Sequence, residues 1–224
     1  MTGVPDRTAA LAAAAEEAAG CTRCALAAGR TQVVYGHGNP QAEVMLVGEA
    51  PGFHEDRRGL PFVGQAGQLL DRLLAGIGLA RDDVYVANVL KCRPPGNRDP
   101  LPEEISACEP HLFRQVELVR PRLVATLGNF ATKLLSARQL GITRVHGQEQ
   151  PVTIGGRHVL LYPLYHPAAA LYTPSMLRVL EDDFARIPSL LARAPAGCGP
   201  ESESGPEPEA PRGRDRRPVQ LGLF

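Results

Sequence analysis

The chain has 224 residues, 44% of them hydrophobic, and its 24 basic side chains balance 24 acidic ones. That length suits one α/β domain with an ordinary buried core, and the zero net charge excludes a globally basic surface, so any nucleic acid must bind at a local patch. No stretch approaches the roughly 20 apolar residues of a membrane span, and the N-terminus lacks the features of a signal peptide, so we expect a cytoplasmic protein.

Helical and strand-like patterns alternate along most of the chain. Apolar runs typical of buried strands alternate with amphipathic or proline-started stretches typical of helices. In chain order, the pattern predicts a helix at 8–19, a strand at 44–47, a helix at 66–77, a strand at 84–89, a helix at 102–119, a strand at 123–127, a helix at 130–135, a hairpin at 152–161 and one closing helix at 175–191.

This alternation predicts an α/β fold: a three-layer α/β/α sandwich around a mostly parallel sheet of about four strands. In such sheets ligands bind beyond the carboxyl ends of the strands, so the loops there are the places to look for a site. We expect residues 1–195 to form a single catalytic domain. Residues 196–224 are dense in Pro, Gly, Glu, Ser and Arg and are expected to form a disordered tail.

The last five residues, Gln220-Leu-Gly-Leu-Phe224, depart from the polar composition of the tail. They resemble the Gln-Leu-x-Leu-Phe peptides that bacterial replication and repair proteins insert into the sliding clamp. On that resemblance Gln220, Leu221, Leu223 and Phe224 form a partner-binding peptide, and the protein works at the nucleoid in a bacterial cytoplasm. The alternative is that Leu223 and Phe224 fold back onto the domain.

Four of the five cysteines have a pattern suited to one metal centre. Cys21 and Cys24 are two residues apart and can hold a metal through two thiolates, and Cys92 with Cys108 can complete the set across the fold. Four thiolates suit either zinc or a 4Fe–4S cluster, and spacing alone leaves both open, along with a role as small buried residues. Cys198 lies in the tail and is interpreted as a spare thiol.

Two segments after the first strand are candidates for a ligand pocket. Gly48-Glu-Ala-Pro-Gly52 turns the chain where sheet ligands bind, which places Glu49 over the pocket. Further on, Phe62 stands between proline and glycine, outside any amphipathic pattern. That placement suits an aromatic platform for a planar ring, although a plain core position is the alternative.

Two polar side chains follow later strands. Asn88 ends the second strand, and its amide can both accept and donate hydrogen bonds to a pyrimidine edge. His166 follows an apolar run and precedes a proline, and its imidazole can donate a hydrogen bond to negative charge on a leaving group. A lone histidine of this kind is more often structural. The hypothesis of a ligand pocket therefore depends on His166 together with Glu49, Phe62 and Asn88.

Four sequence blocks together resemble the family 4 uracil-DNA glycosylases. The blocks are Gly48-Glu-Ala-Pro-Gly52, Gly59-Leu-Pro-Phe-Val-Gly64, Asn88-Val-Leu-Lys-Cys-Arg-Pro-Pro95 and His166-Pro-Ala-Ala-Ala170. The resemblance implies removal of uracil from DNA, and it implies that the four cysteines hold a 4Fe–4S cluster rather than zinc.

The same resemblance implies a role for each matching residue. Phe62 would stack on a flipped uracil, Asn88 would read its edge, His166 would stabilise the uracil anion and Glu49 would position water. Gly48 and Ala50 would line the pocket; Ala50 stands where other glycosylase families place a water-activating aspartate, which leaves the water-activating group open. Leu171, or the tip around residues 170–172, would wedge into the duplex.

Two other function classes remain alternatives on the sequence. One is a hydrolase that uses the same pocket on free nucleosides or nucleotides. The other is a non-enzymatic scaffold associated with DNA or the clamp. Polar groups that converge at strand ends favour an enzyme, because a scaffold does not need them. Nothing in the sequence requires more than a monomer.

Overall fold

The structure, a computed structural model, describes residues 6–136 and 140–194. Its sheet has the strand order β1-β3-β2-β4-β6-β5. The four inner strands are parallel, and β1 and β5 pair antiparallel at the two edges. The strands are β1 (His37–Gly38), β2 (Val44–Gly48), β3 (Tyr85–Asn88), β4 (Leu123–Leu127), β5 (Gln150–Ile154) and β6 (Arg157–Leu164). The predicted parallel sheet is confirmed, with edge strands that bring it to six within the described residues.

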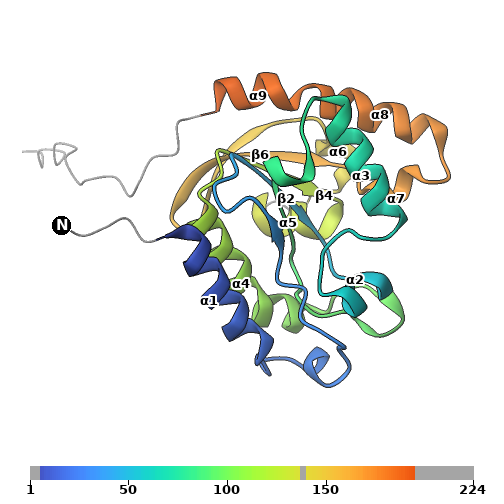
Figure 1. Cartoon of the computed structure of the whole chain (residues 1–224). Helices are drawn as coiled ribbons and strands as arrows, with labels where there is room; N and C mark the ends of the chain where they lie inside the picture. Colours follow the sequence, from blue (N-terminus) through green and yellow to red (C-terminus); the bar gives the residue numbers. More distant parts are fainter. Residues whose placement is uncertain (1–5, 137–139, 195–224) are drawn as a thin grey trace, which may run out of the picture.

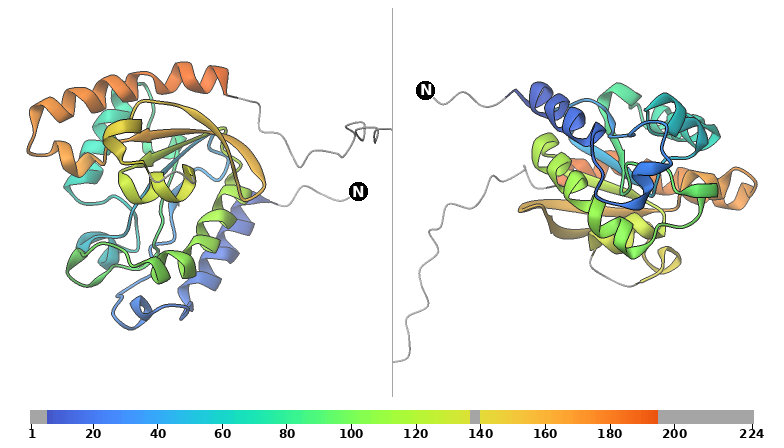
Figure 2. Two further views of the ribbon diagram at one scale, coloured as in Figure 1. Left: turned by 180° about the vertical axis from the view of Figure 1, so that it is seen from behind. Right: turned by 90° about the horizontal axis from the view of Figure 1, so that it is seen from below.

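Helices cover both faces of the sheet, which confirms the three-layer architecture (Figures 1 and 2). One face packs against α1, α4 and α5, and the other against α3, α7, α8 and α9. The helices are α1 (Arg7–Ala19), α2 (Phe53–Arg58), α3 (Gln65–Gly76), α4 (Pro102–Val119), α5 (Asn129–Ser136), α6 (Ile142–Val145), α7 (Pro167–Ala170), α8 (Pro174–Ala185) and α9 (Ile187–Arg193).

The alternation of side chains along β2 explains the two cores. Met45 and Val47 point to the cluster beneath α4, whereas Val44 and Leu46 point to the leucines of α3. Each of these four side chains is almost fully buried, which contributes about 1.5–3 kcal/mol apiece. A strand that is buried on both faces has a continuous run of apolar residues in its sequence, as β2 does.

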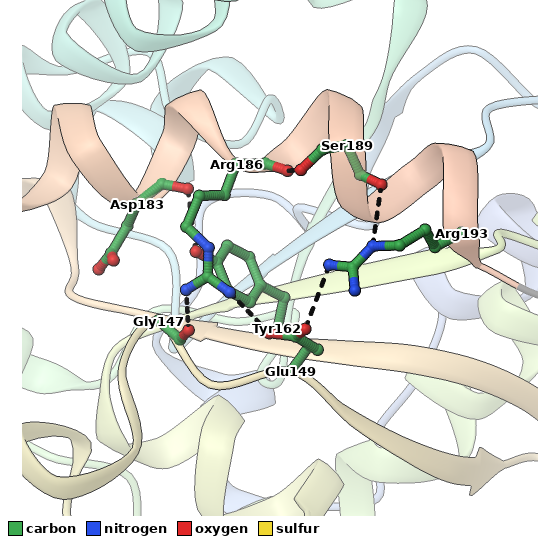
Figure 3. A network of polar contacts seen from close by, with 7 residues as sticks. All are labelled: Gly147, Glu149, Tyr162, Asp183, Arg186, Ser189 and Arg193. Atoms are coloured by element: carbon green, nitrogen blue, oxygen red, sulfur yellow. Dashed lines mark hydrogen bonds and ion pairs between the residues drawn. The ribbon is translucent and has the colours of Figure 1, made fainter.

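The predicted closing helix at 175–191 is wrong in one respect, because the structure has two helices there. The interruption falls at Arg186, and Pro188 in the first turn of α9 has no N–H to donate to the Phe184 carbonyl. The Arg186 guanidinium instead donates to the Gly147 carbonyl and to Glu149, at 2.8 Å (Figure 3). These contacts attach the helix pair to the segment before β5.

No helix in the described ranges is long and apolar enough to cross a membrane.

Candidate active site and cysteine centre

A cavity of about 590 Å³ opens at the carboxyl ends of the parallel strands. It is bounded by the loops that follow β2, β3 and β6, where the topology of a parallel sheet places ligands. Its lining includes Glu49, Ala50, Phe53, His54, Glu55, Phe62, Asn88, Asn97, Arg98 and His166. The structure therefore brings together the pocket residues predicted from separate parts of the sequence.

Gly48 makes room for the two side chains that define the floor of the cavity. It lies beside Asn88 in the parallel pairing of β2 with β3. A Cβ atom at Gly48 would lie 2.4 Å from Asn88 Oδ1 and 2.7 Å from Phe62 Cζ. Only glycine permits this approach, so Gly48 acts by having no side chain.

Asn88 presents an unused hydrogen-bond acceptor. The residue is 2% exposed, and its Oδ1 atom is buried with no hydrogen-bond partner in the described structure. A buried polar atom without a partner costs about 1–3 kcal/mol, and most are satisfied in folded proteins. An acceptor kept in this state beside a cavity is suited to a ligand that brings an N–H donor.

Phe62 is held in a backbone conformation that a phenylalanine rarely adopts, with φ of 53°. Its ring belongs to the core beneath α3 and also lines the cavity, so a core position does not remove it from the pocket. The ring stacks with His166 at 5.6 Å between centroids and 28° between planes. Such strain persists where neighbouring groups fix the chain on both sides.

Two residues that sequence reasoning missed fix the chain around Phe62. The Arg81 guanidinium donates to the carbonyls of Pro61 and Phe62. Glu55 Oε1 accepts the N–H groups of Val63 and Gly64, each at 2.9 Å, just where α3 begins. Gly64 has no side chain to cap that helix, so a carboxylate from α2 supplies the acceptor. The sequence signal for the role of Glu55 was an acidic residue a few positions before the Pro-Phe-Val-Gly turn at residues 61–64.

His166 is fixed in one tautomer. It precedes α7, and its Nδ1 accepts the N–H of Ala168 at 3.1 Å, so the proton of the neutral ring sits on Nε2. Burial among protein groups lowers the pKa of His166 to about 4, against a smaller opposing effect of Glu55. The ring at neutral pH is therefore an uncharged N–H donor beside Phe62.

Glu49 lies partly buried on the same wall of the cavity as Ala50. Burial raises the pKa of its carboxyl, and the negative charge of Asp99 adds to the effect. A carboxylate with a raised pKa is a better proton acceptor than an ordinary one, which suits a group that acts on water.

The four predicted cysteines meet at one small cavity between α1, the loop after β3 and α4. Cys92 and Cys108 are buried, and N–H groups donate toward the sulfurs: Lys91 N to Cys108 Sγ at 3.2 Å and Arg30 Nη1 to Cys92 Sγ at 3.6 Å. Among the described residues, no group of three or more His, Cys, Asp or Glu side chains is arranged to hold a single metal ion.

Lys91 connects the cysteine centre to the pocket, a role that sequence reasoning missed. Its fully buried Nζ donates to the Asn88 carbonyl at 2.7 Å and to Gln115 Oε1 at 2.5 Å. Burial lowers the pKa of Lys91 to about 7. A lysine in a chain whose other basic residues are almost all arginine was the available signal.

Comparison with known proteins decides the family. The model of the uracil DNA glycosylase superfamily matches residues 35–187, which contain the whole pocket. The chain belongs to this superfamily. The resemblance drawn from the four sequence blocks is thereby confirmed.

Similarity to individual members places the chain in the type-4 branch. The type-4 uracil-DNA glycosylase of Sulfurisphaera tokodaii is 46% identical over 180 residues, which cover 78% of this chain and 82% of that protein. The type-4 enzyme of Archaeoglobus fulgidus is 47% identical over 177 residues, covering 77% and 89%. A type-5 enzyme of Pyrobaculum aerophilum is 34% identical over 180 residues, covering 72% and 75%.

The predicted duplex wedge of this glycosylase-family chain, Leu171 or the tip at residues 170–172, lies at the end of α7. Leu171 is partly buried against the core beneath α3 and does not line the pocket. Tyr172, the next residue, is 84% exposed, the most exposed large apolar or aromatic side chain in the described structure. At the tip after α7, Tyr172 is therefore more accessible to a DNA duplex than Leu171.

Proposed function

We propose that the protein hydrolyses the N-glycosidic bond of deoxyuridine in DNA, releases uracil and leaves an abasic site. The unpartnered Asn88 Oδ1 beside Phe62 carries the proposal, because a uracil edge offers the N–H donor that this atom lacks. Family membership supports the same chemistry.

Recognition begins with a nucleotide rotated out of the stack, at a cost of a few kcal/mol. A uracil mispaired with guanine is cheaper to extrude, which assists selectivity. In the pocket the base stacks on Phe62 while Asn88 reads its edge. The thymine methyl group would meet the wall formed by Phe62 or by the segment around His54, which excludes thymine.

His166 contributes as the bond breaks. The sugar becomes oxocarbenium-like and the uracil gains negative charge, so a donor already aimed at that charge lowers the barrier. The neutral Nε2–H of His166 supplies the donor without a proton transfer. Glu49 positions the attacking water and offsets the positive charge of the sugar, in a largely dissociative reaction.

Uracil release from two substrates separates this function from its alternative. We expect free uracil, measured by chromatography, from an oligonucleotide with one deoxyuridine and none from deoxyuridine nucleoside at equal concentration. Release from the nucleoside with weak DNA binding would instead identify a nucleoside hydrolase that uses the same pocket.

Replacing Glu49 by glutamine is expected to slow single-turnover excision about tenfold to a hundredfold and to spare DNA binding. The amide keeps the size of the side chain but removes its charge and its ability to take a proton. Burial raises the pKa of Glu49, so protonation of its carboxyl should lower the wild-type rate as the pH falls. Glu49→Gln has no carboxyl to protonate and should lack this part of the pH dependence. An unchanged rate would remove Glu49 from the mechanism.

We further propose that Cys21, Cys24, Cys92 and Cys108 hold a 4Fe–4S cluster. All four thiols line one cavity, and N–H groups donate toward three of the sulfurs, those of Cys21, Cys92 and Cys108, which favours a cluster held by thiolates. Tetrahedral zinc would need all four sulfurs within about 2.3 Å of one ion, and the described residues contain no group arranged in this way, so a larger cluster suits the site better. When bound, the cluster would tie the segment after α1 to α4, a structural role.

Replacing Cys92 by serine is expected to abolish the visible absorbance of the cluster and to lower the melting temperature by several degrees, because a bound group stabilises the fold that binds it. Iron content and thermal melting measure both effects. The matched control is Cys198→Ser, which should leave absorbance and melting unchanged. Equal absorbance in both variants would contradict the ligand assignment.

We also propose that the C-terminal peptide binds a partner and that the tip after α7 enters the duplex. Gln220, Leu221, Leu223 and Phe224 lie outside the described residues, and their binding to a sliding clamp is tested by deleting residues 220–224 and measuring affinity for the clamp. A cytoplasmic, nucleoid-associated monomer fits this role. At the tip after α7, Tyr172 is better placed than Leu171 to enter the duplex.

A further inference from the structure

A phenylalanine stands exposed at the mouth of the uracil pocket. Phe53, the first residue of α2, is 46% exposed and lines the cavity together with Phe62 and Asn88. The mechanism above gives it no role, because Phe62 already supplies the platform for uracil. An exposed aromatic side chain at a binding cavity is available to a second planar group.

The backbone beneath Phe53 is anchored, so its ring has a defined position. The buried Asp56 of α2 accepts the N–H of Thr31 at 2.9 Å through Oδ1. Gln32 Nε2 donates to the Arg57 carbonyl at 2.6 Å. These bonds attach a short helix to the segment before β1, and an anchored platform loses little entropy when a ligand stacks on it.

Two guanidinium groups from different elements flank the ring. Both make cation–π contacts: Arg57 Cζ lies over the ring at 5.5 Å from the Phe53 centroid, and Arg93 Cζ, from the loop after β3 that runs beside α2 in Figure 1, lies over it at 5.1 Å. Neither arginine pairs with a carboxylate within the described part of the chain, whereas Arg98 on the same rim is paired with Glu104 at 2.6 Å. Arg93 Nε donates to the uncharged Asn97 Oδ1 at 2.7 Å, so no carboxylate within the described residues balances either guanidinium, and both can attract an external anion.

We propose that Phe53, Arg57 and Arg93 form a second nucleotide subsite, which holds the nucleotide next to the flipped uracil. When the nucleotide binds, the guanidiniums move from over the Phe53 ring to the phosphates on either side of the neighbouring base, and that base stacks on the ring in their place. Stacking requires an unpaired neighbour, so the subsite favours uracil in single-stranded or frayed DNA. This inference rests on the proposed excision of uracil and specifies its substrate.

The first test measures the dissociation constant of the full-length protein for single-stranded oligonucleotides by fluorescence anisotropy. The oligonucleotides carry 2′-fluoro-2′-deoxyuridine, whose fluorine opposes positive charge on the sugar and so prevents cleavage. The neighbours are adenine on both sides, or an abasic spacer on one side only. In the wild type, a spacer on one particular side should weaken binding about tenfold, the scale of one base–aromatic stack.

Phe53→Ala should lose that dependence on the neighbour, and Phe53→Trp should keep it. Leu60→Ala is the matched control, because Leu60 is exposed to a similar degree, follows α2 and does not line the cavity. Equal sensitivity to both spacers in the wild type and in Phe53→Ala would overturn the stacking role.

The second test is the salt dependence of the same dissociation constant. Removal of one phosphate contact on single-stranded DNA should reduce the slope of log affinity against log salt by about 0.7. Arg57→Gln and Arg93→Gln should each show that reduction, whereas Arg58→Gln, an exposed neighbour on α2 that does not flank the ring, should not. Identical slopes for all three variants would overturn the phosphate contacts.

An excision assay on ordinary uracil substrates, run in parallel, separates this inference from the proposed function. Normal excision with no effect of Phe53→Ala on binding contradicts only the second subsite. Absence of excision, with binding that still depends on Phe53 and the neighbouring base, contradicts the glycosylase and leaves a nucleotide-binding subsite.

Discussion

Replacing Asn88 by alanine is expected to slow single-turnover uracil excision about a hundredfold to a thousandfold, because the pocket then lacks the groups that read the uracil edge. The side chain is buried, and its Oδ1 has no other partner in the described structure, so its cost in the empty pocket is recovered only when a ligand donates to it. The loss should appear in the rate at saturating enzyme as well as in affinity.

The backbone of Asn88 also matters, and the variant leaves it in place. Lys91 donates to the Asn88 carbonyl, which alanine retains, so the link to the cysteine centre should persist with unchanged cluster absorbance. Gln68→Ala is the matched control: it removes an exposed amide of α3 that does not line the cavity. Similar rates for the two variants would show that Asn88 does not read the base.

Replacing His166 by glutamine or alanine is expected to lower the excision rate by about 10²–10³, the usual cost of one donor aimed at developing negative charge. Glutamine restores a donor of different reach, so it should retain more activity than alanine. Rapid-quench measurement of a single turnover gives the chemical step directly. A rate within twofold of wild type for alanine would exclude His166 as the donor.

The lowered pKa of His166 gives the same variant a second readout. Because the folded pKa is about 4 and the unfolded value is about 6.5, protons bind the unfolded chain more readily between these values. Stability is therefore lost as pH falls from about 6.5 to 4, and His166 contributes no pH dependence above 6.5. Melting temperatures at pH 7 and pH 5 should converge more closely in His166→Gln than in the wild type.

Local signals were enough to predict much of the fold. The bounds of α4 and β4 match the predicted 102–119 and 123–127, because Pro102 marks the first turn and an apolar run marks a buried strand. The break at Arg186 was not predicted, since it depends on contacts with Gly147 and Glu149 far away in the sequence. The two-residue strand β1 is too short to show any periodicity.

In the candidate site, too, some residues could be predicted from the sequence and others could not. Asn88 and His166 stood out by residue type after strands, and Phe62 by its place between proline and glycine, and the structure brings the three to one cavity. The supports around them escaped notice because their function is a long-range contact: Arg81 reaches Phe62 from 19 positions away, and Lys91 reaches Gln115 across 24. Residue type alone does not distinguish such a group from a solvated charge.

The most direct test is strand cleavage of a labelled oligonucleotide that carries one uracil opposite guanine or adenine, with a thymine oligonucleotide as control. Protein with an intact cluster spectrum is incubated with each substrate, and alkali then converts abasic sites into breaks. We expect breaks at uracil only, faster opposite guanine because the mispaired base is easier to extrude. No breaks from such protein, or equal breaks at thymine, would contradict the assignment of uracil as the substrate.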